Sequence, residues 1–366
     1  IKVNCSMLCA LLCLVFGVSA AKTVRPWVFD AVHQSWNNTG TWASGTNFVP
    51  STAVNELEMW QVATYDQETI DKELGYAASL GFNVMRVFLH NLLWEDSETF
   101  LATAERFLES CAARDIGVMF VLFDSCHQDF PALGPQPEPV PYLHNSQWVQ
   151  APGSDFVGDQ QAFSTLQGYV EGVISHFRED ARVVAWDLWN EPDSGGGHEP
   201  EDIEPLLSQV FAWARAASPT QPLTSPLFHF GPWGDFQNLT VLEQLCITES
   251  DVISFHNYGD AAEMQAMVES LQGYGKPLVC TEYMARGEGS VFDPHMGYMK
   301  GEGVGAISWG LVSGRTQTIY PWDSRDDPNP YEGVEDPDPW FHDILYPDGT
   351  PKYSEETAYI RSLTTA

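Results

Sequence analysis

The chain is poor in positively charged residues. It carries 17 Lys and Arg against 50 Asp and Glu, which gives a formal net charge of −33 at pH 7. A surface of this sign repels phosphate backbones and anionic lipids, so the composition argues against nucleic acid and membranes as partners. It argues equally against sulfated or uronic-acid polymers as ligands. Such an acidic surface is typical of proteins that stay soluble in a salty or acidic medium.

Long apolar runs are also scarce. Residues 7–18 form one, and the small residues Val18-Ser19-Ala20 that end it predict a secretory signal peptide over residues 1–21. No other run is long enough to span a bilayer. We therefore expect a protein that is secreted, or held in the lumen of an acidic endomembrane compartment, with one domain over residues 22–366.

Cysteine is too sparse to organise the fold. Without the predicted signal peptide, Cys111, Cys126, Cys246 and Cys280 remain, and their spacing matches neither a metal site nor a disulfide scaffold. Cys280 lies in a strand-like run and is predicted to be a buried small hydrophobe. An oxidising compartment would allow one disulfide among the other three.

Two motifs of other α/β enzymes are missing. No glycine-rich dinucleotide turn follows any strand-like segment, which argues against a doubly wound open sheet. No His-x-His pair occurs, which argues against a metal-dependent hydrolase. We therefore predict no cofactor and no metal ligand, and we expect a monomer.

Strand-like and helix-like segments alternate from residue 45 onward. Apolar runs bounded by turn signals predict strands at 46–49, 83–89, 117–123, 183–188, 223–227, 252–256, 277–281 and 305–309. Amphipathic stretches predict helices at 67–80, 97–113, 160–176, 203–217, 261–272 and 291–300, with a closing helix at 353–363. Eight strands alternating with helices predict a single-domain (β/α)8 TIM barrel. The Pro- and Gly-rich connection 124–159, which carries His144 and Trp148, is long enough to be functional or mobile.

Two of the predicted strands end abruptly in a glutamate. Residues 186–192 read WDLWNEP, in which Asn190 and Glu191 stand just before the final proline. Residues 278–283 read LVCTEY, in which Glu282 stands just before the final tyrosine. A carboxylate at the C-terminal tip of a barrel strand lies on the face where active sites form. Two carboxyl groups facing one cleft are what hydrolysis of a glycosidic bond requires.

These motifs resemble the retaining glycoside hydrolases of clan A, and most of all glycoside hydrolase family 5, over roughly residues 40–320. The resemblance implies that Glu191 is the general acid/base, next to Asn190, and that Glu282 is the nucleophile. Arg86 matches the arginine that supports the nucleophile. His256 and Tyr258 match the sixth-strand His-x-Tyr pair, and Trp309 matches the tryptophan under the sugar that is cleaved off.

Four further residues are candidates for sugar contacts. His90 follows the second predicted strand directly, where it would contact sugar or close a loop by hydrogen bonding. Asn47 lies in the first strand-loop region and could line the pocket. Gln317 and Trp322 belong to a polar and aromatic run after the last predicted strand, a mixture that suits a sugar subsite.

The implied chemistry makes two physical demands on the carboxyl groups. An arginine beside Glu282 would lower its pKa and keep it ionised, whereas Glu191 must stay protonated in a less polar setting or near the charge of Glu282. A retaining enzyme also predicts that the carboxyl groups lie about 5–5.5 Å apart. The expected substrate is a β-linked glucan, mannan or related neutral poly- or oligosaccharide. The alternatives are an exo-acting β-glycosidase on short oligosaccharides and a barrel that binds carbohydrate without cleaving it.

Overall fold

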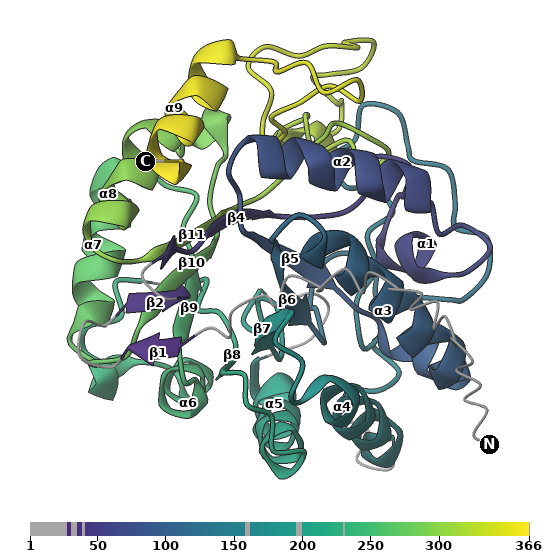
Figure 1. The fold of residues 1–366 in the computed structure, drawn as a ribbon, viewed down its shortest axis with the longest axis vertical. Helices are drawn as coiled ribbons and strands as arrows, with labels where there is room; N and C mark the ends of the chain where they lie inside the picture. Colours follow the sequence, from purple (N-terminus) through teal and green to yellow (C-terminus); the bar gives the residue numbers. More distant parts are fainter. Residues whose placement is uncertain are drawn as a thin grey trace, which may run out of the picture.

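The computed structural model describes residues 28–30, 35–38, 41–157, 162–194, 200–229 and 231–365. The predicted signal peptide, residues 1–21, lies outside the described residues. Eight parallel strands form one sheet in the order β8-β7-β6-β5-β4-β11-β10-β9, surrounded by helices (Figure 1). They are β4 (Ser44–Asn47), β5 (Val84–Phe88), β6 (Gly117–Val121), β7 (Val183–Asp187), β8 (Leu223–Thr224), β9 (Ile253–His256), β10 (Leu278–Glu282) and β11 (Gly305–Ser308). The predicted (β/α)8 barrel is confirmed.

The barrel is closed where its two end strands, β8 and β9, meet through a few hydrogen bonds. Strands β8 and β9 share no continuous ladder, but Leu227 forms a parallel bridge with Phe255. The Leu227 amide donates to the Ser254 carbonyl at 3.0 Å, and the His256 amide donates to the Leu227 carbonyl at 2.8 Å. The seam is therefore short, and it lies beside the strand that carries His256.

The predicted helices lie where the amphipathic pattern indicates. The described helices are α1 (Glu56–Trp60), α2 (Gln67–Ser79), α3 (Ser97–Ala112), α4 (Phe163–Phe177), α5 (Pro200–Ala216), α6 (Val241–Glu249), α7 (Ala261–Gln272), α8 (Phe292–Gly301) and α9 (Ser354–Thr364). Short 3-10 segments occur at η1 (Asn91–Asp96), η2 (Phe236–Asn238), η3 (Arg286–Glu288) and η4 (Trp322–Arg325). A small antiparallel sheet of β1 (Val28–Asp30), β2 (Ser35–Asn38) and β3 (Thr41–Trp42) precedes the barrel. Helices α1 and α6 and this sheet were not predicted, because short elements leave little periodicity to detect.

Local sequence explains where the helices start and how closely the strands pack. Asp260 and Thr240 cap α7 and α6, each in a reciprocal arrangement with the glutamate three positions on, which satisfies amides that have no partner within the helix. Gly45 lies where β4 meets β5, and a Cβ atom there would come within 1.8 Å of the Val84 carbonyl oxygen. Only glycine permits that approach of the two backbones.

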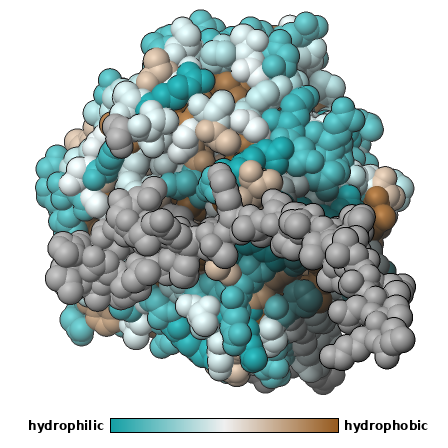
Figure 2. Space-filling model, in the orientation of Figure 1, coloured by the Kyte–Doolittle hydropathy of each residue, from teal (hydrophilic) through white to brown (hydrophobic). Residues whose placement is uncertain are grey.

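The described cysteines form no disulfide. Cys111, Cys126, Cys246 and Cys280 are all free, so the bridge that an oxidising compartment would allow is not made. Cys280 is fully buried, as predicted for a small hydrophobe. No helix within the described ranges is both long and apolar enough to cross a bilayer. On the face seen in Figure 2, hydrophilic residues cover much of the surface and apolar residues are scattered among them.

Candidate active site

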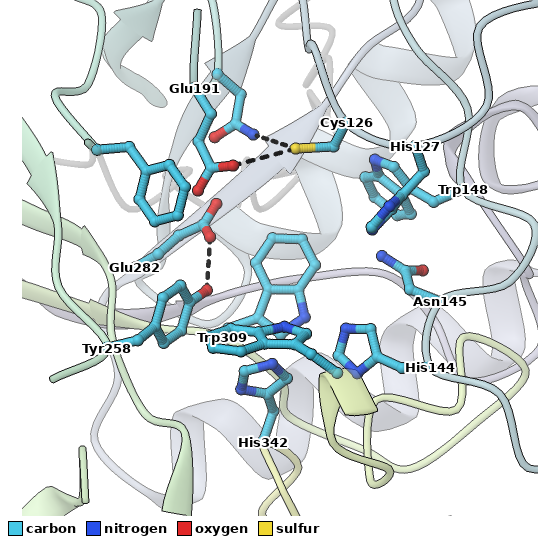
Figure 3. Close-up of a pocket in the computed structure, with 13 residues that line it drawn as sticks. Cys126, His127, His144, Asn145, Trp148, Glu191, Tyr258, Glu282, Trp309 and His342 are labelled. Atoms are coloured by element: carbon cyan, nitrogen blue, oxygen red, sulfur yellow. Dashed lines mark hydrogen bonds between the residues drawn. The ribbon is translucent and has the colours of Figure 1, made fainter. Parts of the chain in front are cut away.

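Glu191 and Glu282 converge at the carboxyl end of the barrel. Glu282 is the last residue of β10, and Glu191 follows β7 after a three-residue extension. One carboxylate oxygen of each residue and a ring nitrogen of His256 all lie within 4.8 Å of one another. The two glutamates are 8% and 4% exposed, and their carboxyl groups lie next to each other at one side of a pocket (Figure 3). The barrel thus brings together two carboxyl groups that are far apart in the sequence.

Arg86, on β5, organises the base of the site. Its buried guanidinium donates from Nη1 to Glu282 Oε1 at 2.7 Å and to Asn47 Oδ1 at 2.8 Å. Nε and Nη2 donate to Asp187 Oδ2 at 3.0 and 2.8 Å, and Nη2 also donates to Asn190 Oδ1 at 2.6 Å. The hydrogen bonds from the charged guanidinium to the two carboxylates are charge-assisted, so they hold the Glu282 side chain firmly in its orientation.

The second oxygen of Glu282 is also held. The Tyr258 hydroxyl donates to Glu282 Oε2 at 2.6 Å. Burial raises the pKa of Glu282 to about 7, while Arg86 and Tyr258 act in the opposite direction. Arg86 lowers this pKa, as expected, but the removal of the carboxylate from water outweighs the arginine's charge, so the net shift is upward.

Glu191 has different neighbours. Its Oε1 lies 2.8 Å from His256 Nδ1, and its Oε2 accepts a hydrogen bond from the Cys126 thiol at 3.2 Å. Burial raises the pKa of Glu191 well above its ordinary value, and the nearby charge of Glu282 raises it further. Burial also lowers the pKa of His256, so the imidazole is neutral and supplies no charge to stabilise a carboxylate. Of the two glutamates, Glu191 therefore keeps its proton to higher pH.

A pocket opens beside the two carboxyl groups. Its free space, including the open mouth, is about 520 Å³. Trp309 lies at its centre in Figure 3, below the level of the carboxyl groups. The lining residues are Cys126, His127, His144, Asn145, Trp148, Asn190, Glu191, Phe228, Tyr258, Glu282, Trp309, Trp322 and His342.

Most of the predicted site residues come together here. Asn190, Tyr258, Trp309 and Trp322 line the pocket beside the two glutamates. Arg86, Asn47 and His256 lie beneath or behind this layer. Asn47 is engaged entirely by protein, since its Nδ2 donates to the carbonyls of Thr281 and Ser308 at 2.8 and 3.0 Å.

Two predicted sugar contacts lie elsewhere. His90 is fully buried and caps η1: its Nδ1 accepts from the Leu92 amide at 3.1 Å, and its Nε2 lies 2.9 Å from the Gln150 carbonyl. Gln317 uses its amide group to join loops, through the Tyr142 amide at 2.9 Å and the Val140 carbonyl at 2.6 Å. Neither side chain lines the pocket, because both form hydrogen bonds with backbone atoms of loops instead.

Several lining residues were not predicted as part of the site. Cys126, His127, Asn145, His144 and Trp148 come from the long connection after β6, whose length was the signal that could have indicated them. Phe228 and His342 lie in loops after β8 and β11, and no motif marks them.

Within the described part of the chain, Glu191, His256 and Glu282 form the group that could hold a metal ion. Their ligand atoms, however, are already engaged. Glu282 is bound by Arg86 and Tyr258, and His256 Nδ1 lies 2.8 Å from Glu191 and 3.6 Å from Glu282. Nδ1 of the neutral imidazole therefore hydrogen-bonds Glu191 and lies close to Glu282.

The buried ionisable groups predict that stability depends on pH. Burial raises the pKa of Glu73 to about 7 and of Asp343 to about 6, so the folded state binds more protons than the unfolded state there, and these two groups lower stability as pH rises through this range. Burial lowers the pKa of His90 and His127 to about 3 and of His144 to about 4, and these three histidines cost stability as pH falls below 6.5, their ordinary value. Because the three histidines outweigh the two carboxyl groups, we expect Tm, measured by thermal denaturation, to rise between about pH 4.5 and about pH 7. A Tm that falls steadily over this range would contradict this balance.

A closed parallel barrel with two buried carboxyl groups converging at its carboxyl end, one of them fixed by an arginine, defines a glycosidase. The model of the family "Cellulase (glycosyl hydrolase family 5)" matches residues 41–313. The chain belongs to glycosyl hydrolase family 5.

Solved structures of similar fold carry names from the same group of enzymes. An exo-β-1,4-mannosidase from Opitutaceae bacterium strain TAV5 is 16% identical with a TM-score of 0.63; the match covers 92% of this chain and only 62% of that chain. The endo-1,4-β-mannanase of Rhizomucor miehei is 14% identical with a TM-score of 0.56 and coverage of 91% and 98%. GH5_18 from Streptomyces cattleya, in complex with GlcNAc, is 13% identical with a TM-score of 0.60 and coverage of 89% and 80%. At these identities the likeness concerns the fold. No curated protein matches the chain.

Proposed function

We propose that this enzyme is a secreted retaining β-glycosidase that cleaves a neutral β-linked glycan by double displacement. The observation that carries the proposal is the asymmetry of the two carboxyl groups. One oxygen of each lies within 4.8 Å of an oxygen of the other, below the roughly 6.5–9.5 Å between carboxyl groups that an inverting enzyme needs to admit water. Of the two glutamates, Glu282 forms an ion pair with Arg86, whereas Glu191 has no cation beside it.

The proposed reaction uses this asymmetry in two steps. Glu191, which keeps its proton to higher pH, protonates the glycosidic oxygen while Glu282 attacks the anomeric carbon. The bond to the leaving group breaks and a covalent glycosyl-enzyme forms, which removes the negative charge of Glu282. Glu191, now a carboxylate, then takes a proton from water, and the resulting hydroxide displaces Glu282 with net retention of configuration.

The surrounding groups are suited to these steps. Arg86 and Tyr258 hydrogen-bond Glu282, so they stabilise the carboxylate both before attack and after release. The half-buried Trp309 offers an indole face on which a sugar ring can stack. Among the described residues that line the pocket there is no Lys or Arg, whereas two carboxyl groups line it, which favours a neutral sugar over an anionic one.

Mannans are the first substrates to test. The solved structures with similar folds include a β-1,4-mannosidase and β-1,4-mannanases, which supports a β-linked mannan or mannooligosaccharide. Secretion is part of the same proposal, and it is supported by the apolar run and small-residue cleavage site within residues 1–21. We further propose that the enzyme acts as a monomer.

The direct experiment is a screen of the purified protein against β-linked mannan, glucan and xylan and against aryl β-glycosides. NMR of the first product should detect the β anomer before mutarotation. Hydrolysis should persist in the presence of a strong chelator, since the reaction needs no metal. Initial release of the α anomer would contradict the retaining mechanism, and failure on every neutral substrate would contradict the proposed function.

Cys126 should tune the proton donor. Its thiol donates to Glu191 Oε2 and accepts from Asn190 Nδ2 at 3.6 Å. Because this donor favours the ionised carboxylate, Cys126→Ala should raise the pKa of Glu191 and move the alkaline limb of kcat/KM to higher pH. We also expect kcat to fall by about fivefold, the effect of one ordinary hydrogen bond.

Two matched variants separate this effect from a general loss of packing. Cys126→Ser retains a donor and should keep the alkaline limb near that of the wild type. Cys111→Ala removes a fully buried thiol on α3, away from the pocket, and should change stability without moving the limb. An unshifted limb in Cys126→Ala would show that the thiol does not influence Glu191.

A further inference from the structure

The side of the pocket opposite Glu191 is closed by two long loops. The loop after β6, residues 122–157, contributes Asn145, His144 and Trp148, and the loop after β11, residues 309–345, contributes Trp322 and His342. We call these five residues the end wall. In Figure 3, Glu191 lies at one side of the pocket, and His144, His342 and Asn145 lie at the other.

Hydrogen bonds fasten the two loops to each other. The Gln317 side chain accepts from the Tyr142 amide at 2.9 Å and donates to the Val140 carbonyl at 2.6 Å. The Asn145 amide donates to the Thr316 carbonyl at 2.8 Å. These bonds join segments about 175 positions apart in the sequence, so the wall is a bridge between loops and not one flexible flap.

A second set of bonds lies behind His144. The His144 amide donates to Ser324 Oγ at 3.0 Å, and Arg325 Nη2 donates to the carbonyls of His144 and Asn145 at 2.7 and 3.0 Å. His144, Asn145 and Ser324 are 3%, 3% and 1% exposed. Buried and hydrogen-bonded backbone of this kind opens rarely, so the wall is part of the resting pocket.

The end wall adjoins the tryptophan beneath the pocket. The Trp148 and Trp309 rings lie 5.8 Å apart between centroids, and the His342 and Trp309 rings lie 6.5 Å apart. Trp322, also a wall residue, lies 6.1 Å from the His342 ring and packs edge-on against Tyr258 at 5.2 Å. Since two rings of the wall pack directly against Trp309, the wall bounds the space beside that residue.

The wall also presents polar groups to this space. His144 Nδ1 lies 2.7 Å from the Tyr320 carbonyl, and His342 Nδ1 contacts the Met284 carbonyl. A carbonyl oxygen can only accept, so each Nδ1 carries the proton and each Nε2 is an acceptor. Burial lowers the pKa of both histidines, that of His144 to about 4, so both rings are neutral. The Asn145 carboxamide oxygen is buried and has no hydrogen-bond partner within the described part of the chain.

From this arrangement we infer that the enzyme is exo-acting and removes one sugar at a time from the non-reducing end. The inference rests on the proposed function, in which the leaving group lies beside Glu191 and the anomeric carbon lies at Glu282. The rest of the cleaved sugar then points away from Glu191, over Trp309 and toward the end wall. The wall accepts the hydroxyl groups of a terminal sugar and leaves no passage for a chain that continues beyond it.

The test compares free and blocked chain ends. The probes are β-1,4-mannohexaose and cellohexaose labelled at the reducing end, each with and without a benzylidene acetal on O4 and O6 of the non-reducing terminal sugar. We expect the unblocked series to shorten by one sugar at a time with release of monosaccharide. The blocked series should resist hydrolysis, because the acetal cannot fit against the wall.

Loosening the bridge provides a second measurement. In the double variant Gln317→Ala/Arg325→Ala, hydrolysis of the blocked hexaose relative to the unblocked one should rise by about tenfold, the effect of losing one or two hydrogen bonds. Gln265→Ala is the matched control, because Gln265 donates to Glu269 on the exposed face of α7 and its loss should leave the ratio unchanged.

The outcomes separate the two claims. Labelled fragments of several lengths at the earliest times, or wild-type cleavage of the blocked hexaose, would overturn exo action and leave the glycosidase proposal intact. Failure to cleave the unblocked hexaoses, the polysaccharides and the aryl glycosides would overturn both. Sequential loss of single sugars together with resistance of the blocked probe would support the inference.

Discussion

Glu282→Ala should abolish hydrolysis, with kcat falling by on the order of 10⁴–10⁶-fold, the loss found when the nucleophile of a hydrolase is removed. Added azide should restore turnover, because a small anion can occupy the space that the carboxylate leaves between Arg86 and Tyr258. Azide would then attack from the face that Glu282 uses, so the product should be the glycosyl azide of inverted configuration. Stopped assays with an aryl glycoside and NMR of the azide product would measure both effects.

Glu191→Ala is the matched variant, because it removes the other carboxyl group from the same pocket. The covalent intermediate can still form from an aryl glycoside with a good leaving group, but its hydrolysis lacks a base. Azide should attack this intermediate from the opposite face and give the glycosyl azide of retained configuration. The same anomer from both variants would contradict the assignment of roles, and full activity in Glu282→Ala would show that Glu282 is not the nucleophile.

The second large effect concerns Arg86. In Arg86→Met the carboxylates of Asp187 and Glu282 lose the cation that compensates them, and we expect a loss of about 3–5 kcal/mol in the free energy of unfolding. Arg86→Lys keeps a charge but not the fork that bonds Asn47, Asp187, Asn190 and Glu282 together. We therefore expect Arg86→Lys to fold and yet to lose roughly 100-fold or more in kcat/KM, as when a catalytic group is slightly misplaced.

Chemical denaturation and pH profiles would measure these two losses. Lysine interacts less strongly with the Glu282 carboxylate than the arginine fork does, so the pKa of Glu282 should rise further. In Arg86→Lys the acid limb of kcat/KM should therefore move to higher pH. Arg178→Met is the control, because that side chain is half exposed and lies 3.9 Å from Glu179, and its loss should change stability by less than about 1 kcal/mol. Wild-type activity in Arg86→Lys would show that charge alone suffices.

The sequence predicted the barrel well because its elements are periodic and long. Apolar runs marked all eight barrel strands, and the glutamates at 191 and 282 stood out because each ends such a run. The parallel arrangement then required their carboxyl groups to share one face. What remained hidden depended on loops, whose course no periodicity reveals.

The site shows the same division. Arg86, Asn190, His256 and Tyr258 could be placed because each lies on a strand or directly after one. Cys126 and the end-wall residues other than Trp322 could not, since loop residues approach the pocket only through bonds between segments far apart in the chain. His90 and Gln317 were polar residues at plausible positions, but the backbone of nearby loops uses their donors and acceptors, and a sequence cannot show that competition.

The short seam between β8 and β9, where Leu227 bridges to Phe255, has a consequence for inactivation by heat. A barrel yields first where its backbone hydrogen bonds are fewest, and this seam lies next to His256 and one strand away from the segment that carries Glu191. Parting of the seam would displace His256 and disturb the pairing of the glutamates while the rest of the core stayed folded. Catalysis would then be lost several degrees below the global melting temperature, and amide exchange would be fastest at Leu227 and His256.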